Sequence, residues 1–262
     1  MNSTNRKGRV LQERDRHLFR ELAVMRIVDR EQAKLVGRFG SDSRTNRRLR
    51  ALTEAGFLRR FFLGTASAGR KAIYALSGRG ALAVDVPYRA LKRRRDEIVA
   101  TDSFVQHQLT INSLYCSLKY SPAPSSDVTL VRWVPFYRPI ADYLSLVPDG
   151  YLELKTPAGV LGHFLEVDLG NEPGSIWRKK AEAYVKLATS GEAERIIGQR
   201  RFRVLVIASS ERRIRSIRTV VAKVVEKIFW FSTVTEALGG GFFNSVWLRP
   251  VGELRQSLIH LP

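Results

Sequence analysis

The sequence predicts an α+β protein of two domains, a small helical domain that ends in a β-hairpin and a larger α/β domain with a central mixed sheet. The chain has 262 residues, which suits one large domain or two ordinary ones. Hydrophobic residues make up 44% of it, enough to build a core. The apolar pattern changes near residue 100, from helices followed by a hairpin to alternating helices and strands.

Positive charge is concentrated near the N-terminus. The chain has 44 Lys and Arg against 25 Asp and Glu, a formal net charge of +19. Residues 1–96 hold 24 basic and 9 acidic side chains, whereas residues 97–262 hold 20 and 16. This asymmetry indicates a polyanion-binding module in front of a second domain. Nucleic acid is favoured over a membrane surface, because no long basic helix has a continuous apolar face.

Composition excludes several other classes of protein. A single cysteine, Cys116, cannot form an internal disulfide, and no Cys/His cluster indicates a zinc site. No apolar run reaches the roughly 18 residues of a membrane span, and residues 1–9 lack the apolar part of a secretory signal. No G-x-x-x-x-G-K-[ST] phosphate loop is present, which argues against ATP-driven chemistry. We expect a cytoplasmic protein without a membrane partner.

Residues 12–85 form the first predicted domain, between a basic tail (1–11) and a charged linker (86–100). Apolar residues at helical spacing, N-cap residues and a glycine stop predict its three helices. Two β-prone runs around a Gly-bounded loop predict a hairpin. These elements are expected at about 12–25, 29–37 and 41–56 for the helices, and at 57–63 and 71–76 for the strands.

The third helix has two distinct faces. Thr45, Leu49 and Leu52 share the apolar face, and arginines lie opposite them. Helix, helix, basic helix and hairpin in this order resemble a winged helix-turn-helix domain, in which the third helix enters a DNA major groove. The resemblance implies contacts with double-stranded DNA, to phosphates and guanine edges. The implied contact residues are Arg44, Arg47 and Arg48 on the helix and Arg70 and Lys71 at the hairpin tip.

Two plainer interpretations of this domain remain open. The arginine face of the helix could simply be solvated, and winged helices also serve as protein–protein modules. The linker, with basic residues 92–95, could touch a DNA backbone or be a solvated connector.

Residues 101–262 predict the α/β domain, with elements in the order α-β-β-β-α-β-α-β. The run at 202–208 is almost continuously apolar, as in a strand buried on both faces. The expected helices are 102–120, 174–190 and 210–230, and the expected strands are 128–134, 149–155, 159–168, 202–208 and 245–248.

Carboxylates flank the two middle strands of this domain. Asp149 begins one strand, and Glu166 and Asp168 end the next, so the returning strand brings them to the same end of a hairpin. Glu166 and Asp168 are two residues apart and leave the same face of the strand. Close carboxylates repel unless a cation lies between them, and oxygen ligands suit Mg²⁺ or Mn²⁺. The alternative is a structural ion pair of these acids with Arg178, Lys179 or Lys180.

This pattern resembles the PD-(D/E)XK nuclease core. Together with the winged helix and the phrases "LVPDGYLEL", "FLEVDLGNEP" and "KKAEAYVKL", the chain over about 12–250 resembles the replication-relaxation family of bacterial plasmids and mobile elements. The resemblance implies a DNA-binding, nuclease-like protein of plasmid replication or mobilisation, associated with nucleoid or plasmid DNA.

The chain departs from the nuclease pattern at Asp168, where the superfamily normally has lysine. Either Lys179 or Lys180 on the following helix replaces it, or Asp168 is a third metal ligand near Glu172, or catalysis has been lost. In an active site Asp149 and Glu166, with or without Asp168, would hold Mg²⁺ or Mn²⁺. Lys179 or Lys180 would then neutralise transition-state charge. His107, on the preceding helix, is either near this site or structural.

Three functions are therefore open at this point. The first is a metal-dependent deoxyribonuclease. The second is a non-catalytic regulator of transcription or plasmid copy number that needs no cofactor, and the third is an accessory factor that recruits a relaxase or replication initiator. The basic helix after residue 208 favours DNA contact by the second domain too. The DNA target, the protein partners and the oligomeric state, a homodimer included, are not determined by the sequence.

Overall fold

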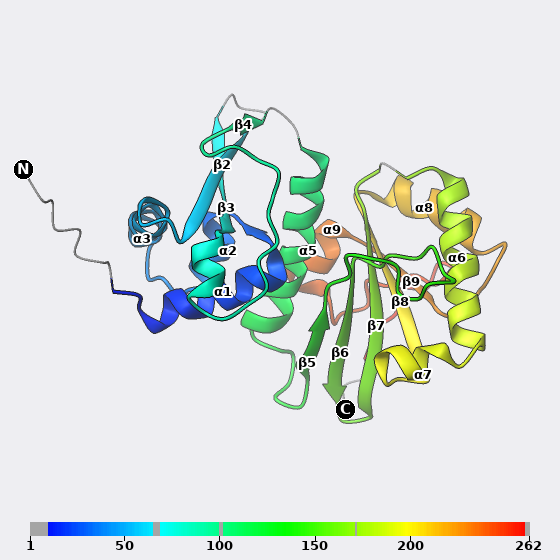
Figure 1. Ribbon diagram of the computed structural model, residues 1–262. Helices are drawn as coiled ribbons and strands as arrows, with labels where there is room; N and C mark the ends of the chain where they lie inside the picture. Colours follow the sequence, from blue (N-terminus) through cyan, green and yellow to red (C-terminus); the bar gives the residue numbers. More distant parts are fainter. Residues whose placement is uncertain (1–9, 65–68, 100–101, 171, 260–262) are drawn as a thin grey trace, which may run out of the picture. The chain divides into compact units, whose positions relative to one another are not determined.

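The computed structural model describes residues 10–64, 69–99, 102–170 and 172–259 (Figure 1). Most of the predicted basic tail and residues 65–68 of the predicted hairpin loop lie outside these ranges. The chain is an α+β protein with two mixed sheets, and it divides into a first unit, Met1–Cys116, and a second unit, Ser117–Pro262. No helix in the described ranges combines the length and the apolar character that a membrane crossing requires.

The first unit contains the predicted helices and hairpin. Its sheet has the strand order β1-β3-β2-β4, in which only the β2–β4 pair is parallel. The elements are α1 (Glu13–Met25), β1 (Ile27–Val28), α2 (Arg30–Val36), α3 (Asp42–Glu54), β2 (Leu58–Gly64), β3 (Arg70–Leu76), α4 (Gly78–Leu82) and β4 (Ile98–Val99).

Local sequence explains where these helices begin. The Asp29 carboxylate accepts a hydrogen bond from the main-chain N–H of Gln32 at 2.9 Å and caps α2. The Ser41 hydroxyl caps α3 by accepting from the N–H of Arg44. Such caps satisfy main-chain donors that the first helical turn leaves unpaired. The apolar face of α3 predicted from the sequence is buried.

The predicted linker contributes to the first unit. Its strand β4 pairs with β2, and the Arg60 guanidinium contacts Asp96 at 2.7 Å. The division between the units also falls later than the linker, inside α5 (Ser103–Tyr120), which the sequence assigned to the second domain. The reason is packing, because the buried Asn112 amide donates to the main-chain oxygens of Met25 and Ile27 at 3.1 and 2.7 Å.

The second unit contains a five-stranded sheet with the order β5-β6-β7-β8-β9. The strands β5, β6 and β7 are antiparallel neighbours, whereas β7, β8 and β9 are parallel. The strands are β5 (Thr129–Val134), β6 (Gly150–Thr156), β7 (Gly159–Asp168), β8 (Phe202–Ala208) and β9 (Phe229–Thr233); the helices are α6 (Gly174–Thr189), α7 (Glu192–Ile197), α8 (Glu211–Val221), α9 (Val234–Glu236) and the π-helix Ala237–Gly241.

Two elements at the end of the chain differ from the expectation. The basic helix predicted to reach residue 230 ends at Val221, and Phe229–Thr233 forms β9 instead. All five residues of β9 are buried, so the segment is a buried strand, last in the sheet beside β8, rather than the end of a surface helix. The strand predicted at 245–248 makes only isolated bridges, from Leu248 to Phe231 and from Trp247 to Gln256. The short α7 was not predicted.

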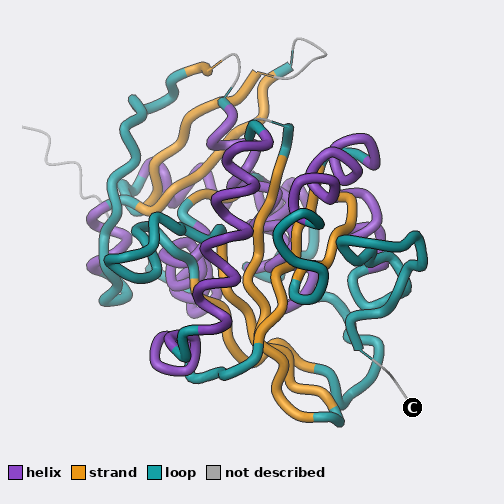
Figure 2. Tube along the Cα trace, turned by 90° about the vertical axis from the view of Figure 1, so that its right-hand side faces the viewer, coloured by secondary structure: helices purple, strands orange, loops and turns teal. Residues whose placement is uncertain are grey.

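The main core lies between the second sheet and helices α6 and α8, which cover one of its faces (Figures 1 and 2). Tyr184 of α6 is central to it, with ring centres 5.5 Å from Phe164 and 5.7 Å from Phe229. Because strand side chains alternate between faces, residues 164, 166 and 168 of β7 point to this helix-covered face. The predicted carboxylates at 166 and 168 are therefore carried on the core side of the sheet.

His163, one residue before Phe164 in β7, is fully buried. Neither of its ring nitrogens has a hydrogen-bond partner among the described residues. Burial, followed by the charge of Arg203, lowers the pKa of His163 to about 3. The folded protein therefore holds this imidazole neutral across the pH range in which a solvated histidine takes up a proton.

We expect His163→Leu to reduce the loss of stability in mild acid. Below a pH of about 6.5 the unfolded chain protonates this histidine and the folded chain does not, so the folded state loses stability as the pH falls towards 3. Between pH 7.5 and 5.5 the wild type should lose about 1.4 kcal/mol more than the variant. Urea unfolding followed by tryptophan fluorescence measures this, because all four tryptophans lie in the second unit. Parallel stability–pH curves for the two proteins would contradict it.

Candidate carboxylate site and candidate nucleic-acid interface

The hairpin of β6 and β7 brings Asp149 to the end of β7, as the sequence predicted. The main-chain N–H of Asp149 donates to the Leu165 oxygen at 3.1 Å. Its carboxylate accepts the main-chain N–H of Val167 at 2.7 Å. These two bonds hold Asp149 beside residues 165–167, and its charge acts on Glu166.

Glu166 is the most buried of the candidate acids, with 1% of its surface exposed. One carboxylate oxygen accepts from the Lys180 ammonium at 2.8 Å, and the other from the Tyr184 hydroxyl at 2.6 Å. Burial raises the pKa of Glu166 to about 7; the Lys180 charge opposes the rise and the Asp149 charge adds to it. The carboxyl groups of Asp149 and Glu166 are thus held close together, and the Lys180 ammonium lies beside Glu166.

Lys180, and not Lys179, is the lysine that reaches the acids. Its ammonium lies 2.8 Å from Glu166 and 2.8 Å from both oxygens of Glu172. Burial alone would lower the pKa of Lys180, but the two carboxylates outweigh it and raise the pKa. Lys179 is exposed on α6. The geometry therefore selects Lys180 from the two lysines that the sequence offered.

Asp168 has a different partner. Arg213 of α8 donates to its two carboxylate oxygens at 2.9 and 2.6 Å, and the Trp177 indole N–H donates at 2.7 Å. Burial acts to raise the pKa of Asp168, but these hydrogen bonds prevail and lower it. The sequence did not identify Arg213 as this partner. The carboxylate at the usual lysine position is therefore bound within the fold by α8.

These contacts bear on the predicted metal ligands. Within the part of the chain that is described, no group of three or more His, Cys, Asp or Glu side chains is arranged to hold a metal. Asp168 is paired with Arg213, which leaves Asp149 and Glu166 as a two-carboxylate set. Mg²⁺ is commonly bound by one or two carboxylates, with water and substrate phosphate completing its shell. His107 is half-buried on α5 in the first unit.

The five predicted DNA-contacting residues of the first unit have different environments. Arg44 and Arg47 are exposed on α3 and Arg70 is exposed at the start of β3. Arg48 instead binds both oxygens of Asp15, a carboxylate with no exposed surface. The hydrogen bond to Asp15 raises the pKa of Arg48. Arg48 is therefore a structural cation that neutralises a buried acid of α1.

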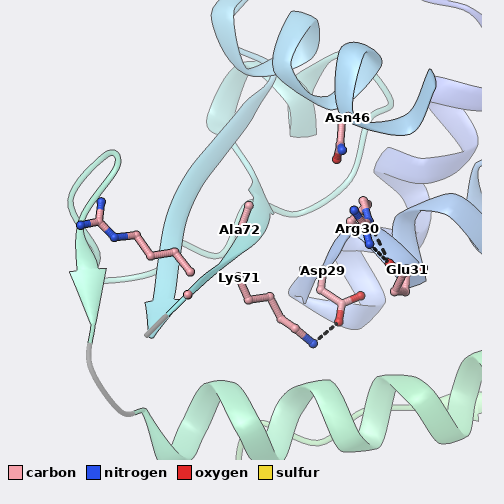
Figure 3. A pocket seen from close by; sticks show the side chains of 8 residues that line it. Asp29, Arg30, Glu31, Asn46, Lys71 and Ala72 are labelled. Atoms are coloured by element: carbon pink, nitrogen blue, oxygen red, sulfur yellow. Dashed lines mark hydrogen bonds and ion pairs between the residues drawn. The ribbon is translucent and has the colours of Figure 1, made fainter. Parts of the chain in front are cut away.

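A cleft of about 460 Å³ lies between Asn46 of α3, the start of α2 and the start of β3 (Figure 3). Across it, Lys71 contacts Asp29 at 3.1 Å, so its charge is partly compensated. Asn46 projects from α3 on the same side as Arg30. Asn46 was not among the residues predicted from the sequence, although an amide between Arg44 and Arg47 is a type that hydrogen-bonds adenine. The lining residues are Asp29, Arg30, Glu31, Asn46, Gly69, Arg70, Lys71 and Ala72.

Removing the Lys180 ammonium should destabilise the second unit, because it leaves Glu166 buried without its cation. Because the pKa of Glu166 is about 7, we expect Lys180→Met to cost more at pH 8.5, where this carboxylate is ionised, than at pH 6, and up to about 3 kcal/mol at the higher pH. We expect the exposed control Lys179→Met to change stability by no more than about 0.5 kcal/mol at either pH. The double variant Glu166→Gln/Lys180→Met should recover part of the loss, since it removes the charge as well. Tryptophan-detected urea unfolding measures all three. Equal stabilities for the two lysine variants would refute the pairing.

Comparison with known proteins gives one match. The model of the family described as replication-relaxation matches residues 19–199. Neither the curated proteins nor the solved structures contain a match to this chain. In the first unit the matched range includes part of α1, the other helices and the hairpin, and in the second unit it includes Asp149, Glu166 and Lys180.

Proposed function

Because the chain belongs to the replication-relaxation family, we propose that it acts on the DNA of a plasmid or mobile element, in replication or mobilisation. We propose further that it binds double-stranded DNA through the first unit and handles the phosphodiester backbone with the second. Each of the two parts of this proposal has its own supporting observation.

DNA binding is supported by uncompensated cations on α3. Among the described residues, neither Arg44 nor Arg47 pairs with a carboxylate, whereas Arg48 and Arg50 of the same helix contact Asp15 and Glu54. The two free arginines lie in the N-terminal half of α3, the part that a recognition helix presents to a major groove. In a winged-helix interpretation Arg44, Asn46 and Arg47 contact base edges and Arg70 contacts a phosphate.

Phosphodiester hydrolysis is supported by a single observation, the 2.8 Å contact of Lys180 with Glu166 beside Asp149. Lys180 lies on α6, the helix that follows the hairpin. It would take the place of the lysine that the nuclease pattern normally has where this chain has Asp168. Asp149 and Glu166 would hold Mg²⁺ or Mn²⁺, which lowers the pKa of bound water and polarises phosphate when present. Lys180 would stabilise developing negative charge, and Tyr184 positions the Glu166 carboxylate through its hydroxyl.

A second candidate is a non-catalytic regulator or an accessory factor that recruits a relaxase or replication initiator. The observation that favours it is the saturation of the acids by donors of the protein itself. Arg213 and Trp177 occupy Asp168, and Lys180 and Tyr184 occupy both oxygens of Glu166. In this candidate function the second unit binds DNA or a partner protein and needs no metal.

Replacing the two free arginines of α3 should weaken DNA binding. We expect Arg44→Gln/Arg47→Gln to lower the affinity for a 30-base-pair duplex and, if both touch phosphates, to reduce the slope of log K against log salt by about 1.8. Fluorescence anisotropy at four salt concentrations measures both quantities. The control is Arg195→Gln, whose guanidinium is already paired with Glu192. Unchanged affinity and slope in the α3 variant would remove this helix from the interface.

Cleavage of supercoiled plasmid separates the two candidate functions. With Mg²⁺ or Mn²⁺ the wild type should nick the plasmid, and Asp149→Asn and Glu166→Gln should lose nicking while retaining DNA binding. Glu192→Gln, an acid of the same unit on the short helix α7, is the matched control and should nick normally. If the wild type binds the plasmid but does not cut it with either metal, the non-catalytic function is the correct one.

A further inference from the structure

Two arginines of the second unit stack on one tryptophan. The guanidinium carbon of Arg203, on β8, lies 4.8 Å from the centre of the Trp230 ring, and that of Arg249 lies 4.5 Å from it. Trp230 lies on β9 between Phe229 and Phe231, which face the main core, so its side chain is on the opposite face of the sheet. This group of three side chains is called the Arg–Trp cluster below.

The cluster holds two positive charges without a counter-ion. Among the described residues neither guanidinium contacts a carboxylate; Arg203 donates to the main-chain oxygen of Leu258, and Arg249 to that of Glu226 at 3.4 Å. Burial lowers the pKa of Arg203, and burial together with the Arg203 charge lowers that of Arg249. Half-buried like charges are unfavourable unless an anion joins them.

Unused hydrogen-bond donors lie in the same place. The indole N–H of Trp230 has no acceptor in the described part of the chain, although only 6% of this residue is exposed. Buried indole N–H groups usually find a partner. A guanidinium stacked on a ring keeps the N–H groups of its edge free to bind oxygen. The cluster is therefore rich in donors and poor in acceptors.

A cleft of about 730 Å³ opens at Arg203. Arg200 and Arg201 also line this cleft; both are exposed, and neither pairs with a carboxylate in the described ranges. Gln199 and residues 160–162 of β7 complete its wall. Gly162 precedes Glu166 by four residues, or about 13 Å along the strand, so this cleft is distinct from the carboxylate site.

We propose that the Arg–Trp cluster and its cleft bind phosphate groups of a nucleic-acid backbone, so that the second unit has a DNA contact of its own. Arginine forks match phosphate oxygens in paired hydrogen bonds. The net charge of +19 attracts a polyanion to the whole chain. The choice of nucleic acid as the source of the phosphate rests on the proposed function; the anion site itself does not.

The anion site is tested first with inorganic tripolyphosphate and the full chain. Thermal unfolding followed by tryptophan fluorescence should shift to higher temperature when the anion is added to the wild type, as binding to the folded state requires. The shift should be lost in Arg203→Gln/Arg249→Gln and reduced in Arg200→Gln/Arg201→Gln. The second variant changes only exposed side chains and keeps the test valid if the first one folds poorly. An equal shift in all three proteins would overturn the site.

Duplex binding then tests the identity of the ligand. Arg200→Gln/Arg201→Gln should lower the affinity for the 30-base-pair duplex several-fold and reduce the salt slope by about 1.8, whereas Arg20→Gln, paired with Glu13 on α1, should change neither. An unchanged duplex affinity would overturn the assignment to nucleic acid. Stabilisation by poly-glutamate equal to that by tripolyphosphate, without an effect on the duplex, would assign the site to an acidic protein instead.

The two proposals fail in different ways. If α3 is not a DNA interface, Arg44→Gln/Arg47→Gln binds the duplex as the wild type does, while the variants of the cleft still lose affinity. If the cleft is not a phosphate site, its variants bind both the duplex and tripolyphosphate normally, while the α3 variant loses affinity.

Discussion

The buried carboxylate of Glu166 is the constraint on which the second unit depends. A carboxylate with 1% of its surface exposed needs a cation and hydrogen-bond donors inside the protein. Lys180 and Tyr184 provide them from successive turns of α6, so this helix has one register against the end of β7. The ring of Tyr184 then packs on Phe164 and Phe229, which links the polar centre to the main core. The helix α6 thus holds the Glu166 carboxylate in place and provides the positive charge beside it.

The same requirement decides which of the predicted functional residues are structural. Asp15 and Asp168 are both buried, and each is bound by an arginine from a neighbouring helix, Arg48 and Arg213 respectively. A basic side chain on a helix that looks solvated in the sequence can therefore be committed to a distant acid. Among the described residues, Arg44 and Arg47 of α3 and Arg200 and Arg201 of the cleft at Arg203 have no such acid.

Local signals in the sequence were enough for the Asp29 cap of α2, and for the bounds of α2, α3, β7 and α6 to within two residues, because nearby side chains determine them. The pairing of Arg48 with Asp15 and of Arg213 with Asp168 spans 33 and 45 residues. The spacing of apolar residues along the chain does not indicate such a distant contact. Asp168 was therefore predicted as a possible metal ligand, and Arg48 as a DNA contact. β9 was missed because its apolar run directly follows a helical pattern, and only pairing with β8 makes it a strand. The sequence analysis did not use Asn112, a polar residue on an apolar helix whose amide ties α5 to the first unit.

The arginines without a carboxylate partner indicate a function more clearly than the carboxylates of the candidate site do. Glu166 and Asp168 at the candidate site accept hydrogen bonds from the protein on both carboxylate oxygens, as folding stability alone would favour. The cations of the Arg–Trp cluster are the opposite case, since Arg203 and Arg249 are half-buried beside each other and, apart from their contacts with the Trp230 ring, no carboxylate of the described residues balances their charge. A protein that only had to be stable would have an acid or an apolar residue there. Both proposed functions would use these cations, and they differ in whether Asp149 and Glu166 would also hold a metal ion.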